Sequence, residues 1–116
     1  MIKFLQSLKH ALAGFRTVLR ERNMRIHLAV AILVVVASFV LRINSTEWIC
    51  ISLSIGLVIA LECVNTAIER VCDRVTMEDD PLIRQAKDVA ASAVLVMAIT
   101  SVITGLIVLL PKILEI

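Results

Sequence analysis

Four polar side chains recur at helical spacing within an otherwise apolar part of the chain. They are Glu62, Asn65, Glu69 and Asp73. At about 100° per residue, all four lie within an arc of roughly 80° on one face of a helix. Ionisable groups at membrane depth are costly and usually face a bundle interior or a wet cleft, so this stripe is a functional hypothesis. The structural alternative is a helix that has already left the bilayer at Glu62, with merely solvated carboxylates.

More charged side chains stand near the same level, with Lys87 and Asp88 before a long apolar run and Glu21 before an earlier one. Carboxylate oxygens suit Mg²⁺, which proteins commonly hold with one or two carboxylates together with substrate phosphates. Phosphoryl transfer needs a base for the acceptor hydroxyl and a cation near the developing charge. Glu62 is therefore the predicted base and Lys87 the predicted phosphate cation. Glu21 and Glu69 are the predicted metal ligands.

Other chemistries fit these residues less well. A di-iron bundle needs Glu-x-x-His pairs, and Glu62 is followed at that spacing by Asn65. The chain has no zinc-ligand spacing and no glycine-rich phosphate loop. His10 and His27 are each interpreted as single interfacial side chains. A small transporter with a proton-linked Glu62, or an assembly subunit, remains the alternative to an enzyme.

The composition indicates which kind of molecule positions these groups. Apolar residues make up 59% of 116 residues, against roughly 45–50% in globular domains. So short a chain cannot bury that much apolar side chain, so some of it must face lipid or other subunits. With only 3 Gly and 2 Pro, the expected elements are helices. Aromatics are too few to be interleaved with basic residues, so no nucleic-acid partner is expected.

The hydropathy pattern predicts a single all-α membrane domain spanning residues 1–116. Leu and Phe at helical spacing predict an amphipathic surface helix over residues 1–22. Three transmembrane helices are expected, over residues 24–42, 47–74 and 81–110. The third is the clearest, because residues 89–110 carry no charge over a length that exceeds the roughly 20 residues a span requires.

Capping residues support these boundaries. Asn44 and Glu47 have the spacing of a capping box, and Trp48 is placed as an interfacial anchor. Asp80 is the expected N-cap of a helix that begins at Pro81, and Pro111 is expected to end that helix. The three cysteines have no CxxC spacing and are interpreted as reduced and buried. They are Cys50, Cys63 and Cys72.

The distribution of basic residues predicts the orientation. Six of them fall in the first 25 positions, and four lie in the connection around residues 70–87, whereas the connection at residues 42–47 has only Arg42. By the positive-inside rule, the N-terminus and the later connection are cytoplasmic. Three crossings then place the C-terminus on the far side of the membrane.

The stripe and its surroundings resemble the prokaryotic diacylglycerol kinase family, which includes undecaprenol kinases. The resemblance rests on residues 62–69, Glu-Cys-Val-Asn-Thr-Ala-Ile-Glu, followed by Asp73 and then by Lys87-Asp88. Weaker similarity covers nearly the whole chain. The resemblance implies a homotrimeric enzyme of the bacterial plasma membrane, with sites shared between subunits. It also implies that Mg-ATP phosphorylates a lipid alcohol, either undecaprenol or diacylglycerol.

The resemblance assigns roles to individual residues. Glu62 resembles the catalytic base, with Asn65 as its polar neighbour at the substrate. Glu21 and Glu69 look like the carboxylates that bind the metal and nucleotide. The remaining nucleotide contacts are implied to be Glu78, Lys87 and Asp88.

Two positions depart from the enterobacterial diacylglycerol kinases. His27 stands where those enzymes have a glutamate, and the segment over residues 21–27 looks like the undecaprenol kinase branch. Asp80 stands where a histidine of the nucleotide-binding loop is often found. The first departure favours undecaprenol as the acceptor, and the second leaves the adenine contacts unassigned.

Overall fold

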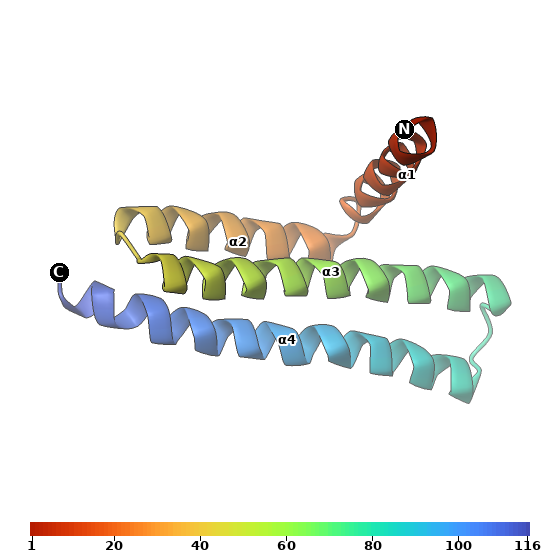
Figure 1. Cartoon of the computed structure of the whole chain (residues 1–116). Coiled ribbons are helices and arrows are strands. Elements are labelled where there is room, and N and C mark those ends of the chain that lie inside the picture. The colour runs from red at the N-terminus through yellow and green to blue at the C-terminus, as the bar shows by residue number, and fades with distance from the viewer.

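A computed structural model describes all 116 residues, as four α-helices and no strand. The helices are α1 (Ile2–Val18), α2 (Arg22–Val40), α3 (Ser45–Val75) and α4 (Pro81–Leu114). The last three run antiparallel to their neighbours, with α3 between α2 and α4 and packed most closely against α4 (Figure 1). α1 leaves the start of α2 at a steep angle to the other three helices (Figure 1).

The predicted caps of the two long helices are confirmed. The Asn44 side chain accepts a hydrogen bond from the Glu47 backbone N–H at 2.9 Å, and the Glu47 carboxylate accepts one from the Asn44 N–H at 2.9 Å. Asp80 accepts hydrogen bonds from the first backbone N–H groups of α4, and Pro81 occupies its first turn. These caps satisfy amide groups that no intrahelical carbonyl can reach.

A tight turn reverses the chain between α2 and α3. The Ile43 N–H donates to the Ser38 carbonyl, and the Arg42 N–H donates to the Phe39 carbonyl. This pair of bonds is the Schellman arrangement, which requires a left-handed residue just beyond the helix. Arg42 supplies it with a φ of 53°. The turn therefore directs α3 back along α2.

The packing of the four helices buries few residues. Only 14 of 116 residues are buried, so the helices present most of their large apolar side chains outward. A small core of Ile43, Ile51 and Val108 joins the α2–α3 turn to α4. Outward apolar surface on this scale belongs against lipid or other subunits.

Three helices, α2, α3 and α4, are long and apolar enough to cross a membrane. The 19 residues of α2 extend about 28 Å, close to the roughly 30 Å of a bilayer core. The 31 residues of α3 and the 34 of α4 extend about 46 Å and 51 Å. Both run past the start of α2 towards the connection at residues 76–80 (Figure 1). We call residues 62–87 the overhang, which comprises this extension and the turn of α3 that begins beside His27 of α2.

Four details differ from the expectations drawn from the sequence. α1 ends at Val18, and α2 covers Arg22–Val40, a shift of two residues from the expected span. α3 is longer than expected at both ends. Pro111 does not end α4, which continues to Leu114. A proline removes one hydrogen bond but keeps a helical φ, and here less than one turn follows it, so the loss is small.

Candidate active site

The predicted polar stripe lies on α3 and becomes more exposed along the helix. Glu62 and Asn65 are 3% and 4% exposed, whereas Glu69 and Asp73 are only partly buried. Because α3 continues through the overhang, the stripe begins near the start of α2 and ends close to the connection before α4. One helix therefore places a buried carboxylate and more accessible carboxylates in a single row.

The buried end of the stripe has a partner on α2. His27 Nε2 lies 3.5 Å from Glu62 Oε2. α2 begins at Arg22, so His27 stands in its second turn, at the level of Glu62 on the antiparallel neighbour. His27 is therefore not the single side chain expected from the sequence. The residue types alone carried no signal for this contact, because it joins two helices.

The middle of the stripe combines a hydrogen bond with unsatisfied polar atoms. The Asn65 Nδ2 group donates to Glu69 Oε1 at 3.2 Å. Asn65 Oδ1 and Thr66 Oγ1 are buried without a hydrogen-bond partner. Buried polar atoms normally find a partner, so these two oxygens, close to Glu62 and Glu69 in the sequence, call for a partner from outside this chain.

Glu21 is paired with Arg70, a residue for which the sequence predicts no role in the site. Arg70 Nη2 donates to Glu21 Oε1 at 3.3 Å. Arg70 directly follows Glu69, so Glu21 lies near the stripe but faces the arginine. Within one chain, no three His, Cys, Asp or Glu side chains gather closely enough to hold a metal ion. The structure therefore pairs the predicted metal ligand Glu21 with Arg70 and the other, Glu69, with Asn65, and it does not join the two into a ligand set.

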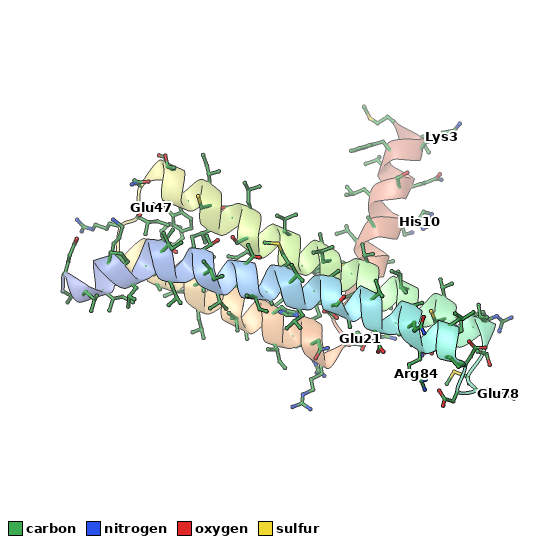
Figure 2. All side chains as sticks on the ribbon, turned by 90° about the horizontal axis from the view of Figure 1, so that it is seen from below. Lys3, His10, Glu21, Glu47, Glu78 and Arg84 are labelled. Carbon is green, nitrogen blue, oxygen red and sulfur yellow. The ribbon has the colours of Figure 1, made fainter.

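Lys87 meets the exposed end of the stripe. Its Nζ donates to Asp73 Oδ1 and joins the first turns of α4 to the last turns of α3. Asp88, the next residue, is exposed. Glu78 is also exposed, in the connection between α3 and α4, and Figure 2 shows it at the end of the molecule opposite Glu47. Accessible acidic and basic groups therefore surround the open end of the overhang.

An apolar groove runs along the bundle from the level of Glu62 towards the opposite end. Its volume is about 440 Å³, and 13 of its 17 lining residues are hydrophobic. α2, α3 and α4 all contribute to it, and His27 is its only ionisable lining residue. The groove is therefore apolar along its length, and its single titratable lining residue, His27, contacts Glu62.

The cysteines agree with their interpretation as reduced but only in part with their expected burial. All three are free thiols. Cys72 is buried and Cys63 half-buried, but Cys50 is exposed. Cys50 lies on an outward face of α3, where an apolar environment comes from outside the chain rather than from its core.

The fold and the site together define a class of protein. Three apolar helices of spanning length, little internal core and a row of carboxylates that begins inside the bundle are the features of a membrane protein with a polar site at one end.

The chain belongs to the prokaryotic diacylglycerol kinase family. A profile described as Prokaryotic diacylglycerol kinase matches residues 9–109. The match includes the entire stripe, Lys87 and Asp88. The predicted family resemblance is confirmed.

Named relatives support the same assignment. The undecaprenol kinase of Bacillus subtilis is 42% identical over 111 residues, which make up 95% of this chain and 90% of that protein. A diacylglycerol kinase of Synechocystis is 39% identical over 116 residues, covering 96% of this chain and 65% of that protein. The diacylglycerol kinase of Escherichia coli K12 is 38% identical over 81 residues, or 70% of this chain and 66% of that protein. The family and these names indicate a lipid kinase and do not favour a transporter or an assembly subunit.

Proposed function

We propose that this protein transfers the γ-phosphate of Mg-ATP to the hydroxyl of a membrane lipid alcohol, with undecaprenol favoured over diacylglycerol. The observation that carries the proposal is the position of Glu62, which is buried and contacts His27, the one ionisable residue that lines the apolar groove. A base at this level can meet a hydroxyl arriving from the bilayer while the nucleotide approaches from water. The high coverage of the Bacillus subtilis undecaprenol kinase supports the choice of lipid.

The proposed roles follow the order of the stripe. Glu62 accepts the proton of the lipid hydroxyl, as general base, and Asn65 contacts the substrate beside it. Lys87 lies at the phosphates, where a cation offsets the developing negative charge. Asp88 and Glu78 complete the nucleotide contacts at the open end of the overhang. The Lys87–Asp73 pair supports this role, because it holds the ammonium group next to the stripe.

Glu21 and Glu69 are the proposed Mg²⁺ ligands and are also proposed to bind the nucleotide. The donor set fits a hard cation, since both proposed ligands are carboxylates and Glu69 contacts the Asn65 amide, whose oxygen has no partner. Substrate phosphates supply the ligands that a single chain lacks. When bound, the ion neutralises phosphate charge and orients the transferred group.

We also propose the orientation and assembly. The N-terminus and the overhang lie in the cytoplasm of a bacterial cell, α1 lies in the headgroup region of the plasma membrane, and the C-terminus is on the far side. The steep angle of α1 to the bundle supports a helix that follows the membrane plane (Figure 1). A homotrimer with shared sites is proposed because one chain leaves its outer apolar faces uncovered and its metal ligands incomplete.

Phosphate transfer from labelled ATP tests the proposal directly. The protein is placed in mixed micelles with Mg²⁺ and offered undecaprenol and diacylglycerol side by side. Glu62→Gln is the inactive variant, and Glu47→Gln is the matched control at the other end of α3. Transfer that depends on Glu62 and not on Glu47 supports the kinase, and the better acceptor identifies the lipid. Folded wild-type protein that transfers phosphate to neither lipid overturns the proposal.

A further inference from the structure

His27 is the one basic side chain within 4 Å of the Glu62 carboxylate. The other cations near the stripe are engaged elsewhere, Arg70 with Glu21 and Lys87 with Asp73. The side chain of His27 is 21% exposed and that of Glu62 is 3% exposed, so the contact is largely shielded from water. The pair joins α2 to α3 at the level where the apolar groove begins.

A carboxylate in such a position needs a partner in order to stay ionised. Removing a charge from water is expensive unless a hydrogen bond or an opposite charge compensates for it. Imidazole Nε2 donates a hydrogen bond in one neutral tautomer and in the imidazolium form. Either form stabilises the ionised carboxylate, which is the form that a general base requires.

We propose that His27 is a positioning residue for the reaction, holding Glu62 ionised and oriented through Oε2 so that Oε1 faces the lipid hydroxyl. This inference rests on the proposed lipid kinase function. Its geometry is a contact between one ring nitrogen and one carboxylate oxygen. The proton taken from the hydroxyl goes to Glu62, and His27 itself forms and breaks no covalent bond.

Because the contact is made by His27 Nε2, variants can be chosen that either keep or remove a nitrogen at that position. A glutamine side chain places its amide nitrogen close to the position of Nε2, whereas asparagine places one closer to Nδ1. His27→Gln therefore preserves the contact with Glu62, and His27→Asn shortens the side chain and loses it. His27→Leu removes every polar atom. His10→Leu is the matched control, because His10 is exposed on α1, away from the stripe (Figure 2).

The test measures kcat and both KM values for lipid phosphorylation in mixed micelles, together with the melting temperature of each purified variant. We expect His27→Leu and His27→Asn to lower kcat by roughly tenfold to a hundredfold, the size expected when a buried charged group loses one polar partner. Both KM values should stay within about twofold, because a base acts on the chemical step rather than on binding. His27→Gln should recover most of kcat, and His10→Leu should match the wild type.

Several outcomes overturn the inference. Full kcat in His27→Asn, or equal losses in the Asn and Gln variants, would show that contact through Nε2 is not what matters. A loss confined to KM would make His27 a binding residue instead. If His27→Leu does not fold, the Asn and Gln pair still decides the question. Wild-type protein without transfer to either lipid would overturn the proposed kinase itself. Transfer lost in Glu62→Gln but intact in both His27→Asn and His27→Leu would overturn the role of His27 alone.

Discussion

The two ends of the α3–α4 pair are joined by the same kind of contact but have different surroundings. At one end Lys87 of α4 pairs with Asp73 of α3, and at the other Lys112 of α4 pairs with Glu47 of α3 at 3.4 Å. The Glu47 carboxylate also caps α3 through the Asn44 N–H. Asp73 belongs to the polar stripe and has no cap to complete.

The difference shows that an ion pair alone does not mark a site. Glu47 and Lys112 hold a helix start against a helix end, and their neighbours are apolar residues and capping groups. Asp73 and Lys87 stand in a row with Glu69, beyond two buried oxygens that lack partners. The chemistry we propose depends on that row, so equivalent substitutions at the two ends should have unequal effects.

The largest difference is expected between Glu62→Gln and Glu47→Gln. The first removes the proposed base and should lower kcat by about 10²–10⁴-fold with nucleotide binding largely retained. Glu47→Gln retains a side chain that can still complete the capping box with Asn44, so its kcat should change little. Phosphate transfer under saturating substrates measures both. Comparable losses in the two variants would remove the distinction between the ends of α3.

A smaller difference is expected between Lys87→Met and Lys112→Met. Loss of a cation at the transferring phosphate should cost about 10²–10³-fold in kcat, whereas loss of the far pair should leave kcat near the wild-type value. The stem of methionine preserves most of the packing in each case. Steady-state kinetics on the two purified variants provide the comparison, and an active Lys87→Met enzyme would contradict the phosphate role.

Glu69→Gln should act on binding, in contrast to Glu62→Gln. Loss of a proposed metal ligand should weaken Mg²⁺-dependent nucleotide binding by roughly tenfold or more, because carboxylates and substrate phosphates would hold the ion together. Titration of each variant with ATP, with and without Mg²⁺, gives the affinities. Equal loss of nucleotide binding in both variants would refute this division of labour between Glu62 and Glu69.

The smallest effect is expected at the cap of α3. Asn44→Ala removes one side of the capping box and should lower stability by about 1 kcal/mol without changing kcat. Thermal unfolding of the detergent-solubilised protein, alongside an activity assay of the folded fraction, tests this. A variant that loses activity while remaining folded would connect the far end of α3 to the reaction.

The helices and their caps could be predicted because the signals are local. An uncharged stretch of spanning length, an Asn44–Glu47 capping box and an Asp80–Pro81 start each depend on residues a few positions apart. The end of α4 was missed because a proline at position 111 removes only one hydrogen bond there. The exposure of Cys50 was missed because apolar surroundings in a membrane protein need not come from its own chain.

The stripe itself was also predictable, since helix geometry alone places Glu62, Asn65 and Glu69 on one face. The residues that contact these side chains from other helices were not predictable. The contacts of Glu62 with His27, and of Glu21 with Arg70, join different helices. Which side chains meet across helices depends on how far each helix slides and turns against its neighbour, and sequence periodicity does not specify that.

By itself, the sequence determined that the chain is helical and apolar enough for a membrane, and that a row of carboxylates interrupts its middle helix. Hydropathy and side-chain spacing are properties of local sequence, so they needed no tertiary information. Only the tertiary structure decided that Glu62 is buried against His27, that Lys87 reaches Asp73 and that an apolar groove ends at this site. Those facts depend on the register of antiparallel helices, which packing between distant segments sets.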